Sequence, residues 1–468
     1  MKTKYYAFFF ALSLLFLPAC KVLTPYHTPS EKLTKALKYR LDVAPADSTS
    51  LADFSWKEIF ADTLLQAYIS KALSENIDVR IALKNMEIAE AYLQQANVNI
   101  APTVALNPTI TYSTSSLNTQ FGQLIGERRH LFQYGVGLQM NWEIDIWGKL
   151  LSERKAVAAD YMRSVAGQQA VASQVVASLA TAYFQLMAYD EQRDILLQNI
   201  DYRAQYITTS KALKEAGLLT EVAVKQAEAQ LLNVKSRLLT TDYLIKTQEN
   251  YLHLLMGESP DTLLRSKLSQ TEISANIQTA YPIQLLANRP DVRAAEFELI
   301  KAFELTNVAQ AQFYPSLTIT GSTGLQSIDL DKLFSLHSIF ANIVGGLTQP
   351  IFNQKRIRSN LAVRKSSEEI AYLNFRKSLL TATQEVSNAL AAFETQSNIA
   401  ALKQREYETF ALATQFSEDL VNNGLGNYLD IILANERALN AQLEYIQARY
   451  AQLSAQVQLY RALGGGWR

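Results

Sequence analysis

The chain has 468 residues, of which 48% are hydrophobic and 19% charged, so it is long enough to bury a large core or to hold several domains. Its 44 basic and 44 acidic residues give a formal net charge of zero. This balance argues against a nucleic-acid partner, because binding a polyanion requires a basic surface. One cysteine and four histidines scattered along the sequence exclude a disulfide framework and a Cys/His zinc cluster. We therefore expect no metal and no cofactor.

The N-terminus carries an export signal. Lys2 and Lys4 precede an uncharged stretch that is too short to cross a bilayer as a helix and suits the core of a signal peptide. The stretch ends in Leu17-Pro18-Ala19-Cys20, which resembles the lipobox of a bacterial lipoprotein. We expect cleavage after residues 1–19 and acylation of Cys20, which would anchor the chain to a membrane. An ordinary signal peptide with an incidental cysteine is the alternative.

Two long spans of the chain lack proline and are free to be helical. They cover residues 109–259 and 351–468. Glycine subdivides each span into a long helix, a turn and a shorter helix, with the first pair over 149–216 and 218–256. A helix of the first length would extend about 100 Å, which does not fit inside a compact globular domain. Apolar side chains recur along it at intervals of three and four, the spacing of a coiled-coil seam.

The two halves of the chain are copies of each other. Asp78-Val79-Arg80 recurs as Asp291-Val292-Arg293 at an offset of 213, whereas Gly217 matches Gly424 at an offset of 207. The six-residue difference must fall between the two motifs, and we place it in the loop over 118–131. A repeat of about 210 residues implies the duplication of a whole substructure.

Strands with one apolar and one polar face lie between the helices. Apolar and polar residues alternate over 103–114 and 132–145, and the repeat predicts two further strands over 316–327 and 338–349. Such strands fit either a soluble sandwich or a membrane barrel. Four strands cannot close a barrel alone, so in the second case several chains must share one. Its lumen would be lined by Thr, Ser, Asn and Gln, as in a wide and weakly selective pore.

Five motifs in order along the chain match a known family. They are Trp142-Glu143-Ile144-Asp145-Ile146-Trp147-Gly148-Lys149, Arg289-Pro290-Asp291-Val292-Arg293-Ala294-Ala295-Glu296, Tyr314-Pro315-Ser316-Leu317, Gln349-Pro350-Ile351-Phe352 and Leu463-Gly464-Gly465-Gly466-Trp467. Together with the lipobox and the duplication they resemble the TolC/NodT-type outer-membrane factors, over essentially the whole mature chain. Single motif residues also have structural explanations: Pro290 and Asp291 suit the first turn of a helix.

The resemblance implies a fold class and a domain order. The fold would be an α+β membrane protein, internally duplicated, in which a homotrimer forms a 12-stranded β-barrel with four strands per chain, continued by a long α-helical coiled-coil barrel. The expected order is a signal peptide (1–19), a lipid-anchored tether (20–60), a first repeat (61–257), an equatorial connector (258–289), a second repeat (290–464) and a C-terminal tail (465–468). Each repeat would hold a helix, a β-hairpin and a long helix pair.

The resemblance also implies a function. The chain would be the outer-membrane exit duct of a tripartite efflux pump, passively conducting drugs or other toxic small molecules. Its partners would be a periplasmic adaptor protein, an inner-membrane RND-type pump and outer-membrane lipid. The alternatives are a type I secretion duct and a non-channel, lipid-anchored coiled-coil structural protein. An enzyme is disfavoured, because the sequence holds no Gly-rich phosphate loop and no Ser/His or Cys/His nucleophile pair.

The turns between the long helices are the candidate functional site. In the family these turns close the periplasmic entrance and meet the adaptor. Many relatives carry an aspartate just after the second turn, where this chain has Gly426, and the departure puts an acidic gate in doubt. We expect the gate or the adaptor contact at Gly217, Leu420, Asn422, Asn423, Gly424 and Gly426. The hypothesis is that Leu420, Asn422 and Asn423 narrow the entrance and rotate outward on opening. The alternative is that they are ordinary helix-end residues.

Overall fold

The computed structural model describes residues 23–29, 54–271 and 288–468. Cys20 lies outside the described residues, as do the signal peptide, most of the predicted tether and about half of the predicted connector. The chain divides into two compact units. Unit 1 comprises residues 1–28, 87–162 and 296–374, and unit 2 comprises residues 29–86, 163–295 and 375–468.

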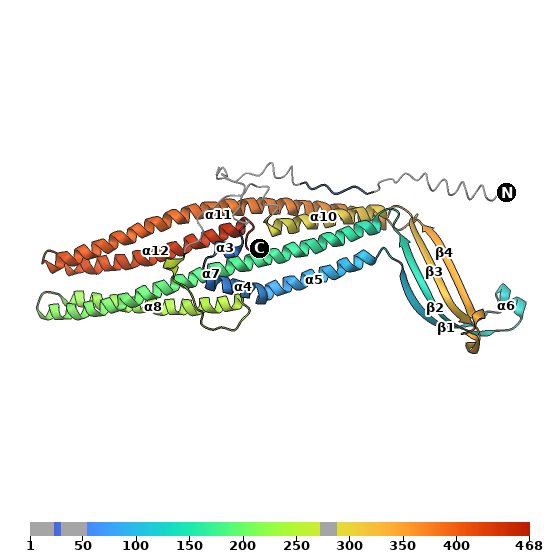
Figure 1. The fold of residues 1–468 in the computed structure, drawn as a ribbon, viewed down its shortest axis with the longest axis horizontal. Helices are drawn as coiled ribbons and strands as arrows, with labels where there is room; N and C mark the ends of the chain where they lie inside the picture. Colours follow the sequence, from blue (N-terminus) through green and yellow to red (C-terminus); the bar gives the residue numbers. More distant parts are fainter. Residues whose placement is uncertain (1–22, 30–53, 272–287) are drawn as a thin grey trace. The chain divides into compact units, whose positions relative to one another are not determined.

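Unit 1 contains one antiparallel sheet of four strands. The strands β1 (Thr103–Thr114), β2 (His130–Ile144), β3 (Ser316–Ser327) and β4 (Ile339–Thr348) lie side by side in chain order (Figure 1). All four predicted strands are confirmed to within two residues at each end. The strands form because period-two alternation and β-branched residues suit a pleated surface with unlike faces.

The strand register gathers the apolar side chains on one face. Residues paired across antiparallel strands share a face. Val104 pairs with Met140, Met140 with Gly321, and Gly321 with Ile343, so one row crosses all four strands. We call this side the apolar face. Its members are Val104, Leu106, Ile110, Tyr112, Phe132, Tyr134, Val136, Leu138, Met140, Trp142, Ile144, Leu317, Ile319, Leu325, Ile339, Ile343 and Leu347.

The apolar face is uncovered. Leu106 is 64% exposed, Ile110 73% and Ile343 78%. In a sandwich, a second sheet would bury these side chains at a spacing of about 10 Å. The described residues form only one sheet, so a sandwich folded from one chain is excluded. The face is free to meet lipid.

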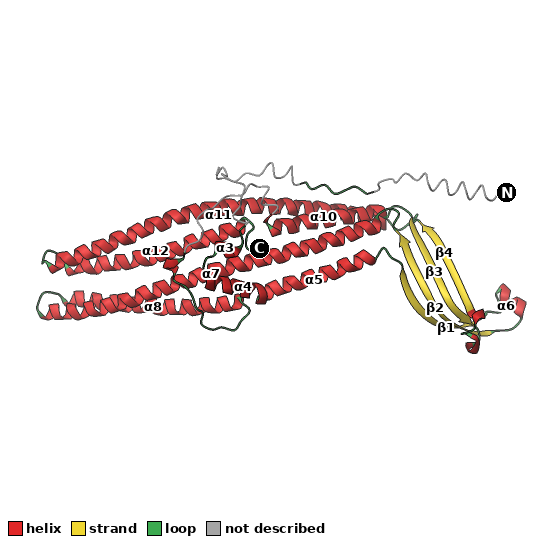
Figure 2. Cartoon of the chain, viewed as in Figure 1, coloured by secondary structure: helices red, strands yellow, loops and turns green. Residues whose placement is uncertain are grey.

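Two pairs of long helices follow the strands. The helix α7 (Lys149–Glu215) is followed by α8 (Glu221–Leu255), and α11 (Arg356–Asn422) by α12 (Tyr428–Ala462). Within unit 2, α8 runs beside α7 and α12 beside α11 (Figure 2). The long members have 67 residues each and the short ones 35, as the duplication predicts. The pattern of long helix, glycine turn and shorter helix is confirmed in both copies.

One helical segment predicted over 62–100 is two helices. Here α4 (Thr63–Glu75) ends at Asn76 and α5 (Ile77–Val98) begins after it. The Asn76 side chain explains the break: Oδ1 accepts hydrogen bonds from the amides of Asp78 and Val79, at 2.9 and 3.1 Å. An asparagine at this position caps a new helix instead of continuing the old one. In the second copy, α10 (Pro290–Ala311) begins at the predicted proline.

Short elements complete the fold. They are α3 (Trp56–Ile59), α6 (Gln120–Ile125), and the 3₁₀ turns η2 (Leu268–Gln270), η3 (Leu330–Lys332) and η4 (Leu336–Ser338). The helix α6 lies in the β1–β2 loop, where the extra residues of the first copy were expected. The offset is 213 at the ends of β1 and β3 and 207 at the starts of α7 and α11. The difference therefore falls between Thr114 and Lys149, a range that contains the predicted loop.

Both ends of the predicted tether make packing contacts where they are described. In unit 2, Trp56, Ile59 and Phe60 are buried in the main core, so the extended tether expected up to residue 60 ends earlier. In unit 1, the Asn307 amide donates to the Thr24 carbonyl at 3.3 Å. The core of unit 2 is built from α4, α7, α8, α11 and α12; its fully buried side chains include Leu65, Ile69, Leu179, Tyr183, Phe184, Leu186, Phe375 and Tyr460.

The helix α7 contains an apolar stretch of membrane-spanning length. Among the described helices it alone is long and apolar enough to cross a bilayer, but 67% of that stretch is buried inside the protein. Its small residues, such as Ala177, Ala180 and Ala182, are almost fully buried. Burial of this kind is the mark of a core helix that packs against neighbours on several sides.

The turn into α11 carries backbone strain that the first copy avoids. Gln354 and Lys355 both adopt positive φ, at 55° and 65°, and the residue equivalent to Lys355 in the first copy is Gly148, at φ 77°. For a residue with a Cβ atom, this conformation costs about 1–2 kcal/mol of folding stability. This turn also explains why α11 begins only at Arg356, within the proline-free span that starts at residue 351.

Replacing Lys355 by glycine is expected to stabilise unit 1. Relief of the strain at positive φ outweighs the entropy that glycine adds to the unfolded chain. The free energy of unfolding should therefore rise by about 0.5–1 kcal/mol. A raised midpoint of thermal unfolding would show this. Gly148→Ala is the reciprocal control and should lower the midpoint, because a Cβ there would lie 2.6 Å from Cδ1 of Leu23. Equal midpoints for Lys355→Gly and the parent would mean that the turn is relaxed.

Candidate functional site

The two turns between the long helices have the same backbone. Gly217 and Gly424 adopt φ of 75° and 74°. The amide of Leu218 donates to the Leu213 carbonyl, and the amide of Leu425 to the Leu420 carbonyl, both at 2.9 Å. These bonds close a helix C-terminus around a left-handed residue, a position that favours glycine. Gly217 and Gly424 are therefore placed by helix capping.

The second turn leaves little room for a side chain at Gly426. A Cβ there would lie 3.0 Å from Cγ2 of Val421 and 3.1 Å from Cβ of Leu420. This close approach gives a physical reason for the glycine, because neighbouring atoms would have to shift to admit a Cβ. The Asn423 side chain donates to the Asp419 carbonyl at 2.7 Å. Leu420 is about half exposed and Leu425 mostly exposed.

Asn422 is the last residue of α11. Its side chain is outside what the structure describes, so its predicted role is a proposal on sequence alone. The structure brings Leu420, Val421 and Gly426 together, and it places Gly217 in a separate turn of the first copy. Of the three residues predicted to narrow the entrance, Leu420 and Asn422 lie in the last turn of α11 and Asn423 is the first residue after it.

Two ion pairs connect α7 to α8 next to the first turn. Lys214 contacts Glu221 at 2.5 Å, and Lys211 contacts Glu228 at 3.1 Å. The hydrogen bond from Lys214 holds the pKa of Glu221 below its usual value. Three of the four side chains are about half exposed and Glu228 is partly exposed, so these pairs add little stability. They fix the charge pattern that this turn presents to water.

Three hydrogen bonds tie α7 to the second helix pair within unit 2. The Tyr202 hydroxyl donates to Oε1 of Glu418 on α11 at 2.7 Å and accepts from Nδ2 of Asn435 on α12 at 3.0 Å. The Tyr206 hydroxyl donates to the Tyr428 carbonyl at 3.2 Å. Burial, reinforced by Glu418, raises the pKa of Tyr202, so its hydroxyl stays a donor. Neither tyrosine was predicted as a functional residue, although two tyrosines four apart on one helix face are visible in the sequence.

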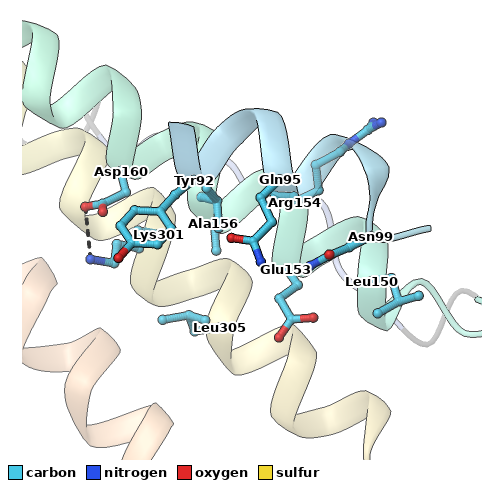
Figure 3. Close-up of a pocket in the computed structure, with 12 residues that line it drawn as sticks. Tyr92, Gln95, Asn99, Leu150, Glu153, Arg154, Ala156, Asp160, Lys301 and Leu305 are labelled. Atoms are coloured by element: carbon cyan, nitrogen blue, oxygen red, sulfur yellow. Dashed lines mark hydrogen bonds and ion pairs between the residues drawn. The ribbon is translucent and has the colours of Figure 1, made fainter. Parts of the chain in front are cut away.

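A pocket of about 290 Å³ lies in unit 1 among α5, α7 and α10 (Figure 3). Figure 3 shows the Lys301 ammonium paired with the Asp160 carboxylate, at 3.0 Å. The rest of the wall mixes aliphatic and amide side chains with Glu153 and Arg154. Two acids and two bases line the pocket, so it favours neither sign of charge. Its lining holds no serine, cysteine or histidine that could act as a nucleophile.

The apolar face has the height of a membrane. Aromatic side chains mark its ends: Tyr112 and Phe132 form one pair, and Trp142 lies ten residues further along β2. Ten residues of strand span about 34 Å, which a tilt of about 40° reduces to about 26 Å. An apolar band of about 25 Å between two aromatic girdles is typical of outer-membrane barrels. The Trp142 indole donates to the Ile100 carbonyl at 2.8 Å, which satisfies its polar edge.

Comparison with known proteins decides the family. The model of the outer membrane efflux protein family matches residues 68–258 and 281–465. The chain belongs to this family. The resemblance expected from the five motifs is thereby confirmed, and the protein is an efflux component of the outer membrane.

Individual relatives extend over nearly the whole chain. The toluene efflux pump outer membrane protein TtgF of Pseudomonas putida is 28% identical and covers 100% of this chain and 98% of its own. The probable outer membrane lipoprotein SilC of Salmonella typhimurium is 25% identical, with 97% of each chain covered. The structure of the open state of the MtrE outer membrane channel of Neisseria gonorrhoeae matches with a TM-score of 0.86 and 26% identity, covering 95% of this chain and 98% of that one.

The family accounts for the arrangement of the chain. An outer-membrane efflux protein needs a surface for lipid and a path for solutes, and the sheet supplies an apolar and a polar face. The relatives are channels and pump components, not enzymes. Within the described residues, no group of three or more His, Cys, Asp or Glu side chains is placed to hold a metal ion.

Proposed function

We propose that three copies of this chain close one 12-stranded barrel and form the passive exit duct of an efflux pump. The observation that carries the proposal is the uncovered apolar face, about 26 Å high, opposite a polar face of Thr, Ser, Asn and Gln. Such a sheet is stable in a bilayer only when every strand edge is paired. The sheet ends at β1 and β4, so β1 of one copy would pair with β4 of the next.

The proposed partners are a periplasmic adaptor and an inner-membrane RND-type pump. A duct has no energy source of its own, so the pump must supply the gradient. The relative TtgF is named for a toluene efflux pump and SilC for an outer membrane lipoprotein. We infer toxic small molecules as the substrate class of this chain, rather than a secreted protein. We further propose that the chain performs no catalysis.

Acylation of Cys20 fits the contacts of the residues that follow it. Leu23 lies beside Gly148, between β2 and α7, and Thr24 is held by Asn307. The described start of the chain, three residues after Cys20, therefore lies beside this junction. Acyl chains on Cys20 would enter the leaflet next to the end of the apolar face. We therefore propose that the lipid and the sheet hold the protein in the same membrane.

The native mass and the conductance of the detergent-extracted, lipidated protein test the proposal. We expect a mass near three times 52.4 kDa, less the signal peptides, and stepwise current in a planar bilayer. A monomer without conductance would show that the strands form no shared barrel. A conducting trimer would refute the coiled-coil structural alternative.

The turn after α11 is the proposed entrance constriction. Replacing Leu420 and Asn423 together by serine should increase single-channel conductance, because both changes shorten a side chain at the narrowing. The pair Leu213 and Ala216, at the equivalent positions of the first copy, offers a control: serine there should leave conductance unchanged. If the first double variant conducts like the parent, the gate lies elsewhere on the chain.

A further inference from the structure

A second cavity lies in unit 2 among α7, α8 and α12. Its volume is about 200 Å³. The side chains that line it are mainly polar, and the full set is Arg203, Ala229, Gln230, Asn233, Val234, Arg237, Glu436, Leu439 and Asn440. None of these residues belongs to the proposed gate or to the apolar face.

Two guanidinium groups face this cavity. Arg203 is only 7% exposed; it donates from Nε to Oδ1 of Asn199 at 2.6 Å and from Nη1 to Oε1 of Gln230. Arg237 donates from Nη1 to Oδ1 of Asn440 at 2.7 Å. All three acceptors are neutral amides. A guanidinium carries five N–H donors, so both groups retain donors that these bonds do not use.

The cavity has more positive than negative charge. Glu436 is the single acid in its lining, and its Oε2 accepts from Nε2 of Gln230 at 3.2 Å. Within the described part of the chain, no carboxylate lies within ion-pair distance of Arg203 or Arg237. Burial lowers the pKa of Arg203, Glu436 opposes this effect and Arg237 adds to it. Arg203 nevertheless stays charged, because arginine is not deprotonated in proteins.

Buried charges are normally paired, since removing an ion from water without a counterion is costly. Two guanidinium groups that share one cavity are the arrangement that binds oxyanions, by paired N–H donors from planar forks. We propose that this cavity binds a small oxyanion, of which inorganic phosphate is the simplest, between Arg203 and Arg237. The anion would link the α7–α8 helix pair to α12 and stabilise unit 2.

Thermal unfolding in phosphate tests the site. The detergent-extracted full-length protein is titrated with sodium phosphate while sodium chloride holds the ionic strength constant. We expect a saturable rise of about 2–4 °C in the unfolding midpoint at high phosphate. Calorimetry should find one phosphate bound per chain. No rise and no binding would overturn the proposal.

Two variants separate an anion site from a merely structural cluster. Arg237→Gln removes one fork and should abolish the phosphate response. Asn440→Asp places a carboxylate where Arg237 already donates, so it should raise the unfolding midpoint in the absence of phosphate. The phosphate concentration needed for a further rise should increase about tenfold or more. If the cluster is purely structural and binds no ligand, neither the parent nor the two variants should respond to phosphate.

The matched control is Arg193→Gln. Arg193 joins α7 to α8, as Arg203 does, but it is paired with Asp242 at 2.7 Å and lies outside the cavity. This variant should keep the full phosphate response. The site would be refuted if phosphate raised the unfolding midpoint of Arg237→Gln or of Asn440→Asp as much as that of the parent. Phosphate would then act elsewhere on the protein.

Discussion

Replacing Leu138 by arginine is expected to prevent the protein from entering the membrane. Leu138 lies near the middle of the apolar face, between the Tyr112–Phe132 pair and Trp142, and is 47% exposed in the isolated chain. Arginine at the midplane of a barrel's lipid face costs about 2–4 kcal/mol. Because each copy would carry the change, the cost is repeated in every chain of the barrel. The variant should be depleted from the outer-membrane fraction, and its native mass should no longer correspond to the assembled form.

Ser322→Arg is the matched control on the opposite face. Ser322 pairs with Gln139, one residue from Leu138, so it lies at the same level of the sheet but on its polar side. The protein should still assemble and conduct, because arginine there is solvated by water in the lumen. Its current should become more anion-selective. Equal membrane insertion of the two variants would refute our assignment of lipid and lumen faces.

Replacing Arg289 by glutamine is expected to destabilise unit 2 by about 2–3 kcal/mol. The buried guanidinium binds Asp291 and Glu385, each at 2.6 Å from Nη2, and donates from Nη1 to the Ala462 carbonyl at 2.9 Å. Removing one member of a buried charge network leaves the others uncompensated, at a cost of about 3–5 kcal/mol. Both carboxylates are partly exposed, which reduces the expected loss. Thermal unfolding of the variant measures it.

The penalty of the Arg289 variant should depend on pH. Burial raises the pKa of Asp291, but hydrogen bonds from Arg289 outweigh it and the net pKa is lowered. A carboxyl with a depressed folded pKa contributes stability above its unfolded pKa of about 3.9 and loses it as the pH falls through the folded value. The variant and the parent should therefore differ most at neutral pH and converge below about pH 4.

Lys403→Gln supplies the control for this pH series. Lys403 makes comparably short contacts to Glu406 and Glu444, but on the surface of its helix pair. Exposed ion pairs contribute little, so its removal should leave the midpoint nearly unchanged. A constant penalty for Arg289→Gln from neutral to acid pH would mean that the loss comes from packing and the Ala462 contact alone.

The sequence by itself determined the elements and their order. Strands were visible because the alternation of Phe132 to Ile144 is a local property of the chain, readable without knowing what covers it. The long helices followed from the absence of proline and the spacing of Gly217 and Gly424. The duplication added the third and fourth strands, including β4, whose own pattern is the least regular.

The tertiary structure decided which residues break these patterns. Asn76 stands at the position of Arg289 in the other copy; its Nδ2 donates to the Leu255 carbonyl at 2.8 Å, where Arg289 reaches the Ala462 carbonyl. The two side chains differ in chemistry but donate to equivalent carbonyl groups in the two copies. Their residue types alone could not reveal this equivalence. The strain at Lys355 was hidden as well, because a lysine in sequence carries no sign of a positive φ.

The candidate site divides in the same way. The turn glycines were predicted because glycine is the residue that a left-handed cap favours. The Tyr202–Glu418 bond and the Arg203–Arg237 cavity join residues about 30 to 240 positions apart, and no local pattern encodes such a meeting. Local periodicity is fixed by the backbone geometry of a single element, whereas charge pairing and close approach depend on how separate elements pack. The sequence therefore determined the helices, the strands and the turns, and only their packing decided where a charge is left without a counterion.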